Sequence, residues 1–195
     1  GAIAIGNSEE NASGNPVETT AASGKYSLAF GYRATAGGIY STAIGGGAEA
    51  TGENSLALGT HSAEDKTKKT VASGHASISI GHNSVAAGDA SMALGIQSQA
   101  LNRYSFAANG GIVEANASGQ PGGIAMGIGA KVTGTGALAL ATWDGTGGYG
   151  GSYSSNGHEF TWTSGRTTLA SGSSSVAIGN GVTASGWGSV AMGYG

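Results

Sequence analysis

Four histidines are the residues of this chain best suited to acid–base or metal chemistry, and their positions do not bring them together. His61 and His82 follow glycines that end short apolar segments, His75 follows a glycine of another type of segment, and His158 lies in a long aromatic-rich stretch. Metal binding or general-base catalysis needs several such groups converging on one point. We therefore interpret these histidines as solvent-exposed turn residues.

Other catalytic patterns lack either their residues or their structural setting. No Gly-x-Ser-x-Gly elbow lies between a strand and a helix, so the many serines do not predict a nucleophile. Residues 145–150 (GTGGYG) match a dinucleotide fingerprint, but no helix follows to receive a pyrophosphate. Calcium-binding nonapeptide repeats need one aspartate per repeat, and the chain has only Asp65, Asp89 and Asp144. We expect no enzyme activity, no cofactor and no metal.

Composition excludes further classes of function. The chain has no cysteine, which rules out disulfides, thiolate zinc sites and a cysteine nucleophile. Its net charge is −3 with only 10% charged residues, so we expect no nucleic-acid partner. No apolar run is long enough to span a membrane, and we expect no direct membrane contact. The chain starts within one repeat and stops within another, which suggests a fragment of a longer array.

A fourteen-residue repeat organises almost the whole chain. It reads Ser-φ-Ala-φ-Gly, two free positions, Ala-x-Ala-x-Gly and two more, where φ is a large apolar residue. Eleven copies begin at Ala2, Ser27, Ser41, Ser55, Ser77, Ser91, Ser105, Gly123, Ala137, Ser175 and Ser189. A fixed period of this kind is typical of a solenoid in which each repeat forms one coil.

Each coil is predicted to hold two short strands. Leu56 and Leu58 lie two residues apart, which is strand periodicity, so they should face one side and Ala57 the other. Residues 48–52 (AEATG) alternate more weakly and should form the return strand. The glycines at repeat positions five and twelve should form the corners, where glycine tolerates a positive φ. Each strand should pair in parallel with its equivalent in the next coil.

A single coil of this kind is expected to be marginal. Burying its two large side chains offsets only part of the entropy lost on ordering fourteen residues. The small alanine at position three would let a neighbouring chain approach closely. We therefore expect the chain to oligomerise.

Four coils are longer than fourteen residues, with insertions near residues 7–19, 63–70, 112–116 and 143–166. Each lengthened coil contains Ala-Ser-Gly, which predicts that all four insertions enter at one corner of the coil. The tripeptides are residues 22–24, 72–74, 117–119 and 170–172. Stacking would align these loops along one edge, as in many recognition surfaces.

The insertions differ in chemistry. Residues 63–70 cluster three lysines, Lys66, Lys68 and Lys69. The longest insertion is rich in aromatic residues: Trp143, Tyr149, Tyr153, Phe160 and Trp162. Exposed aromatic residues are enriched in protein interfaces. The alternative is that this loop folds over and buries its own rings.

The repeat resembles the head domain of trimeric autotransporter adhesins of the YadA type, whose heads carry tandem copies close to NSVAIGxxS. The best match here is residues 54–62 (NSLALGTHS), followed by 76–84 (ASISIGHNS), 90–98 (ASMALGIQS) and 174–182 (SSVAIGNGV). The resemblance implies one head-repeat domain over residues 1–195, folded as a left-handed parallel β-roll. It also implies a homotrimer displayed on the outer membrane surface of a Gram-negative bacterium.

Such heads bind host extracellular-matrix proteins (collagen, laminin or fibronectin) or host cell receptors. The resemblance makes these repeat residues candidate ligand contacts: Asn54, Ser55, Ser62, Ser91 and Ser98. Their serines also have a structural interpretation, in packing and in turns.

Three other functions are alternatives to adhesion. The chain could be a structural spacer that holds a distal binding tip away from the cell. The plain repeats fit a spacer function, and the varied insertions fit it less well. A left-handed β-helix acyltransferase has a six-residue period, which this chain lacks. An ice-binding solenoid needs columns of threonine, and the threonines here do not align in columns.

Overall fold

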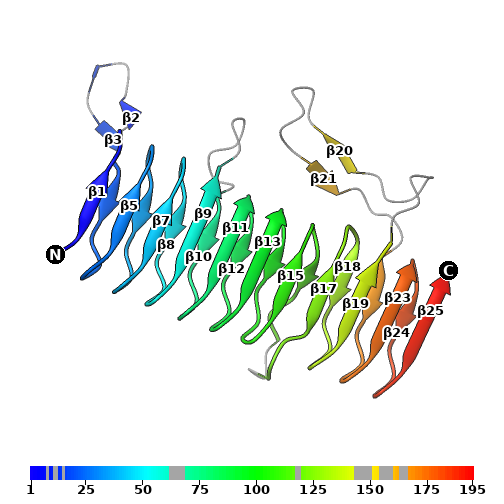
Figure 1. Ribbon diagram of the computed structural model, residues 1–195. Helices are drawn as coiled ribbons and strands as arrows, with labels where there is room; N and C mark the ends of the chain where they lie inside the picture. The colour runs from blue at the N-terminus through cyan, green and yellow to red at the C-terminus, as the bar shows by residue number, and fades with distance from the viewer. Residues whose placement is uncertain are drawn as a thin grey trace.

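The computed structural model describes residues 1–7, 9–10, 13–14, 16–61, 69–116, 120–142, 151–153, 160–162 and 167–195. Within these residues every regular element is a β-strand, and the strands form two long parallel sheets and two short hairpins. Figure 1 shows an elongated roll in which successive coils stack from the N-terminus to the C-terminus. The prediction of an all-β parallel roll is confirmed.

Sheet 1 contains one strand from each of the eleven repeat copies, in sequence order. Its parallel register places equivalent repeat positions side by side, so that Ala57 pairs with Ala43 in one neighbouring coil and with Ser79 in the other. The strands are β1 (Ile3–Ile5), β5 (Leu28–Phe30), β7 (Thr42–Ile44), β9 (Leu56–Thr60), β11 (Ile78–His82), β13 (Met92–Ile96), β15 (Phe106–Ala108), β17 (Ile124–Met126), β19 (Leu138–Ala141), β23 (Val176–Asn180) and β25 (Val190–Tyr194).

Sheet 2 contains ten shorter return strands, also parallel and in coil order. They are β4 (Ala21–Ala22), β6 (Thr35–Ala36), β8 (Glu49–Ala50), β10 (Val71–Ala72), β12 (Val85–Ala86), β14 (Gln99–Ala100), β16 (Ile112–Val113), β18 (Ala130–Val132), β22 (Thr168–Ala170) and β24 (Thr183–Ala184). Strand β8 confirms the return strand predicted at residues 48–52. We call the turn from sheet 1 to sheet 2 the first corner, and the turn into the next coil the second corner.

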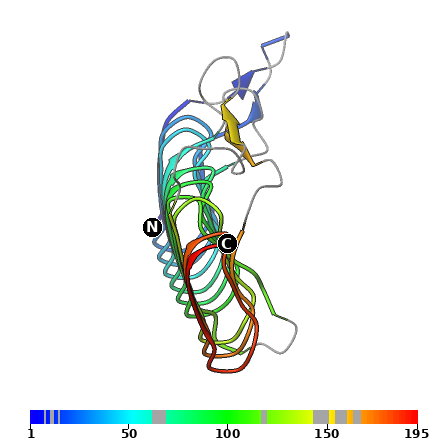
Figure 2. The same cartoon turned by 90° about the vertical axis from the view of Figure 1, so that its right-hand side faces the viewer.

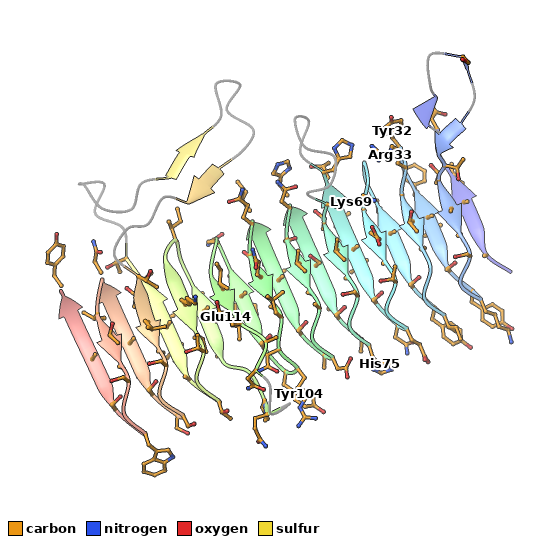
Figure 3. All side chains as sticks on the ribbon, turned by 180° about the vertical axis from the view of Figure 1, so that it is seen from behind. Tyr32, Arg33, Lys69, His75, Tyr104 and Glu114 are labelled. Carbon is orange, nitrogen blue, oxygen red and sulfur yellow. The ribbon has the colours of Figure 1, made fainter. Side chains whose placement is uncertain are left out.

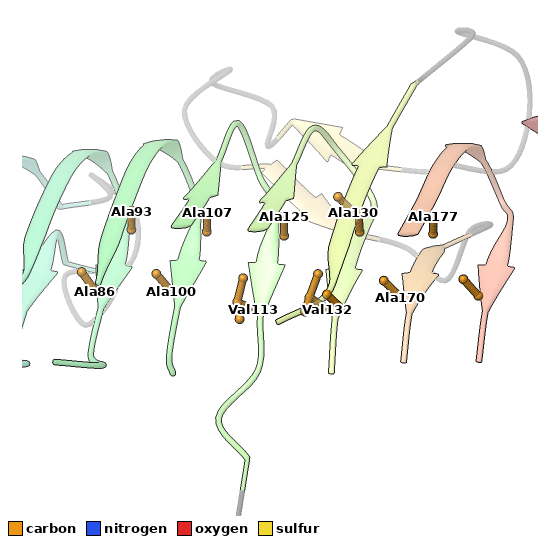
Figure 4. Close-up of a cluster of buried hydrophobic side chains, with 13 residues drawn as sticks. Ala86, Ala93, Ala100, Ala107, Val113, Ala125, Ala130, Val132, Ala170 and Ala177 are labelled. Carbon is orange, nitrogen blue, oxygen red and sulfur yellow. The ribbon is translucent and has the colours of Figure 1, made fainter. Parts of the chain in front are cut away.

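The interior of the roll is lined mainly by alanine, together with buried serines such as Ser79 and Ser84. Ala43 and Ala57 of sheet 1 and Ala36 and Ala50 of sheet 2 have no exposed surface, and the same positions are buried along the roll. Figure 4 shows two rows of these small side chains facing each other, with Val113 and Val132 as the larger members. Seen along its axis in Figure 2, the roll is a flattened ring. The close spacing of the two sheets therefore leaves room for small side chains at most interior positions and for valine at a few.

The predicted orientation of the large apolar residues was wrong. They lie on the outer face of sheet 1 and not in the interior, and Leu58 and Phe30 are 40% and 51% exposed. The alanine at position three faces the interior, so it does not form a surface for a neighbouring chain. Alternation along a strand separates two sets of side chains, and the narrow interior accepts only the smaller set.

The two corners use glycine for different reasons. At the first corner, Gly45 has a φ of +120°, as the sequence suggests. At the second corner, Gly38 has no such φ, and a Cβ added there would overlap the carbonyl oxygen of Gly52 in the next coil. The positive φ instead falls two residues later, on Tyr40. The prediction of positive φ at both glycines was therefore correct only for the first corner.

Three of the four insertions leave the roll at the first corner: those between β1 and β4, between β9 and β10, and between β19 and β22. The fourth differs from the prediction. Ile112 and Val113 form β16 and pair in register with Gln99 and Ala100, so they belong to the regular coil. The extra residues lie between β16 and β17, at the second corner. Residues 117–119, which suggested the wrong corner, lie outside the described part of the chain.

Candidate functional site

The three insertions at the first corner gather along one long edge of the roll. Two of them carry antiparallel hairpins, β2 (Glu9–Glu10) with β3 (Pro16–Glu18), and β20 (Gly151–Tyr153) with β21 (Phe160–Trp162). Both hairpins stand beyond the same edge of the two sheets in Figures 1 and 2. This edge therefore carries inserted segments, and the two regular parallel sheets of the roll hold them.

A threonine closes each of these insertions where the chain re-enters the roll. Thr20, Thr70 and Thr168 each donate a side-chain hydrogen bond of 2.6–2.8 Å to the carbonyl oxygen of a first-corner glycine in the next coil. The Thr20 hydroxyl oxygen also lies 3.0 Å from the Asn7 carbonyl oxygen, and that of Thr70 lies 3.1 Å from the Thr60 carbonyl oxygen, where the same insertions begin. The hydroxyl thus ties together the two ends of the first two insertions.

The threonine occurs in the coils with a first-corner insertion and not in the others. In coils without a first-corner insertion the same position holds Ala34, Ala48, Ser84, Ser98, Gly111, Ala130 or Val182. Thr20, Thr70 and Thr168 each stand two residues before Ala-Ser-Gly, in the sequences TAASG, TVASG and TLASG. The misleading copy at residues 115–119 reads ANASG and lacks the threonine. This signal was available in the sequence and was missed.

Aromatic and polar side chains line the edge between the insertions. The ring of Tyr32 lies 6.4 Å from that of His61, centre to centre, and the Arg33 guanidinium lies 5.8 Å from the Tyr32 ring centre. One coil further along, Thr60 Oγ1 and His82 Nδ1 are hydrogen bonded at 3.1 Å. Figure 3 places Tyr32 and Arg33 at the loop-bearing edge. Sequence reasoning did not identify either residue, because each occupies a free repeat position.

Two half-buried lysines form ion pairs on the outer face of sheet 2. Lys69 Nζ lies 3.3 Å from Glu49 Oε2, and Lys131 Nζ lies 2.6 Å from Glu114 Oε1. Lys69 stands where an insertion rejoins the roll. Its ammonium group is therefore held against sheet 2 by Glu49.

Comparison with known families decides what the chain is. The model of the YadA head domain repeat matches residues 22–48, 36–62, 72–98, 86–108, 121–140 and 169–195, which together span more than half of the chain. The chain belongs to the YadA head family. This confirms the resemblance drawn from NSLALGTHS and its relatives, and the family is one of adhesive and structural surface proteins. A search of curated proteins finds no match.

Several residues predicted to bind ligand in this YadA-like head lie outside the described residues: Ser62, Lys66, Lys68, Trp143 and Tyr149. Tyr153, Phe160 and Trp162 belong to the hairpin β20–β21, in which Tyr153 pairs with Phe160. The structure thus brings the backbones of Tyr153 and Phe160 together on one element. Lys69 lies at the first-corner edge, where its side chain forms the ion pair with Glu49.

The serines of the YadA-like repeat have structural surroundings. Ser55 is 2% exposed and its hydroxyl donates to the Gly52 carbonyl oxygen at 2.6 Å. Ser91 is buried, and Ser98 is buried with its hydroxyl bonded to the Leu94 carbonyl oxygen at 2.6 Å. Buried hydroxyls offer no surface to a macromolecule, so we propose no ligand contact for these three. Asn54 is exposed, with a φ of +56° that asparagine tolerates well.

Two further observations concern the part of the YadA-like head that the structure describes. No three histidine, aspartate or glutamate side chains cluster there in a way that would hold a metal ion. None of the described residues belongs to a helix with the length and hydropathy needed to cross a membrane.

Proposed function

We propose that this chain is the head of a homotrimeric surface adhesin that binds host extracellular-matrix proteins or a host cell-surface receptor. Membership of the YadA head family supports this role, together with display on the outer membrane surface of a Gram-negative bacterium. The observation that carries the proposal is the alignment of three insertions along the first-corner edge. A uniform spacer has no need for such an edge.

Trimerisation is supported by the outer face of sheet 1. Most coils place two large apolar side chains there, among them Leu56 and Leu58, and the register aligns them in two rows that are interrupted by Thr42 and Ala108. Exposed apolar patches of this extent mark interaction surfaces. The outer face of sheet 2 is mixed, with Glu49, Gln99 and Lys131 among its residues. Sheet 1 is therefore the face that another copy would cover.

The assembly is tested by light scattering coupled to size-exclusion chromatography. The unchanged chain should have about three times the mass of the 18.7 kDa chain. Leu58→Glu, on the outer face of sheet 1, should shift the mass toward that of a single chain, because it places a charge in the apolar contact. The matched control Val85→Glu, on sheet 2, should keep the trimer. A monomeric parent, or a Leu58→Glu variant that remains trimeric, would contradict this interface.

Recognition is assigned to the first-corner insertions, and the aromatic insertion at residues 143–166 is its strongest candidate. The aromatic residues there (Trp143, Tyr149, Tyr153, Phe160 and Trp162) and the lysines at 66, 68 and 69 are the side chains that we propose to contact the ligand. Tryptophan and tyrosine are enriched among the residues that contribute most of the binding energy at protein interfaces.

Solid-phase binding to collagen, laminin and fibronectin tests this proposal. The unchanged chain is compared with a variant in which a short Gly-Ser turn replaces residues 143–166, and circular dichroism verifies that both are folded. Binding that only the unchanged chain shows would place recognition on this insertion. Equal binding by both would move recognition to the other insertions or the repeat face. A folded trimer that binds no matrix protein and no host cells would favour the spacer function instead.

A further inference from the structure

The second corner, on the edge opposite the three first-corner insertions, carries three exposed tyrosines in an unfavourable backbone conformation. Tyr26, Tyr40 and Tyr104 have φ values of +60°, +55° and +54° and are 48%, 55% and 65% exposed. A bulky side chain at such a φ is an outlier, whereas asparagine and glycine adopt it readily. The other described coils with a positive φ here hold Asn54, Ala76, Ala90, Gly136, Ser174 and Gly188. The turn itself therefore does not explain the tyrosines.

The tyrosines bracket a stretch of small residues. Tyr26 and Tyr40 stack, with ring centres 5.2 Å apart and planes inclined by 17°. Backbone hydrogen bonds then connect the corner coil by coil through Asn54, Ala76 and Ala90 to Tyr104. Four coil steps at the usual strand spacing separate Tyr40 and Tyr104 by about 19 Å.

At the far end of this stretch, no aromatic residue occupies the equivalent corner position in the described coils on either side of Tyr104. The equivalent positions on either side of Tyr104 are Ala90 and Gly122, and the Gly122 amide donates to the Arg103 carbonyl oxygen. Both are too small to cover a ring. Figure 3 shows Tyr104 and His75 at the edge opposite Tyr32 and Arg33.

Among the charged residues of this corner, two acidic residues lie between two basic ones. Lys25, Glu53, Asp89 and Arg103 are all exposed, and their formal charges cancel. The Lys25 ammonium lies 4.9 Å from the centre of the Tyr26 ring. A polyanion would be repelled by Glu53 and Asp89, and a polycation by Lys25 and Arg103. A neutral ligand rich in hydroxyl groups finds hydrogen-bond donors and acceptors in the same row.

We propose that the second corner between Tyr40 and Tyr104 binds a neutral oligosaccharide chain. The faces of tyrosine rings carry partial negative charge that attracts the C–H groups of a sugar ring. Glu53, Asp89 and Arg103 hydrogen bond to its hydroxyls. The surface lies on the opposite edge from the three first-corner insertions, so it is independent of the matrix-binding function proposed above.

A microarray of neutral, sialylated and sulfated oligosaccharides tests this site. The unchanged chain should bind neutral glycans, and the double variant Tyr40→Asn/Tyr104→Asn should lose at least tenfold of that binding. Because asparagine suits the positive φ, the same variant should keep or raise the melting temperature, which separates lost contact from lost folding. The matched control Tyr32→Asn, at the first corner, should keep glycan binding.

Binding only to sialylated or sulfated glycans, binding to no glycan, or neutral-glycan binding retained by the double variant would each overturn the proposal. The variant lacking residues 143–166 should bind neutral glycans as well as the unchanged chain does. The two proposed sites can therefore fail separately.

Discussion

The side-chain hydroxyl of Thr70 donates a 2.8 Å hydrogen bond to the carbonyl oxygen of Gly81, which lies in the next coil of the roll. The same hydroxyl lies 3.1 Å from the carbonyl oxygen of Thr60, where the insertion begins. One buried group thus connects the beginning of an insertion, its end and the neighbouring coil. Thr20 has the equivalent arrangement in the first insertion.

Replacing Thr70 by valine removes this hydroxyl while keeping the shape of the side chain. We expect a loss of about 1–3 kcal/mol of stability, because the Gly81 carbonyl oxygen then loses its side-chain donor at a buried position. Thermal unfolding followed by circular dichroism measures the change. Thr70→Ser keeps the hydroxyl and should lose much less. Equal melting temperatures for the valine variant and the parent would show that the hydroxyl does not stabilise the insertion.

Gly38 and Gly46 form a matched pair for measuring how much stability is lost when a glycine is replaced by alanine. Gly38→Ala should destabilise the roll by about 3 kcal/mol or more, because the new Cβ overlaps the Gly52 carbonyl oxygen and the coils have to separate. Gly46 has no atom within 4 Å of a built Cβ, so Gly46→Ala should change stability by less than about 1 kcal/mol. Chemical denaturation compares the two. Similar stabilities would show that the coil spacing adjusts easily.

The interior and the outer face of sheet 1 should respond oppositely to larger side chains. Ala43 has no exposed surface and lies between Ala29 and Ala57, so Ala43→Leu should cost about 3 kcal/mol or prevent folding. Thr42, on the outer face, lies between Leu28 and Leu56, and Thr42→Val should raise the melting temperature. Soluble expression and thermal unfolding measure both. An interior that accepts leucine would contradict the alanine-limited spacing of the sheets.

The ion pair between Lys69 and Glu49 should contribute only modestly. Its side chains are 25% and 32% exposed, so a double-mutant cycle with Lys69→Met and Glu49→Gln should give a coupling of about 0.2–1 kcal/mol. The coupling should fall as salt is added, because ions screen exposed charges. A coupling that salt does not change would indicate a different kind of contact.

The period of the sequence was enough to predict the roll, but not which side chains fill it. Alternation between Leu56, Ala57 and Leu58 defines two sets of side chains, and large residues are usually the buried set. The interior is instead limited by how closely sheets 1 and 2 approach, which depends on the short corners on both sides. The outward set then forms an apolar surface, and a single sequence does not show what covers such a surface.

The location of the candidate site was predicted in part. The insertions were recognised from their excess length, and three of them share the first corner as expected. The fourth was misplaced because Ala117-Ser118-Gly119 matches the tripeptide that follows a true re-entry. A true re-entry is distinguished by a threonine two positions before the Ala-Ser-Gly tripeptide. The role of this threonine depends on a hydrogen bond to the next coil. Contacts between coils are not visible in the composition of any one repeat.

The cost of lengthening a coil follows from how the insertions are closed. Extending a closed loop from fourteen residues to the 38 between Ala137 and Ser175 adds only about 0.9 kcal/mol of closure entropy, because this cost grows with the logarithm of length. The strands on either side keep their register across this insertion. Segments of new length and composition can therefore accumulate at the first corner at little thermodynamic cost, while the alanine interior permits almost no change. Variation and constraint are thus separated onto different parts of each coil.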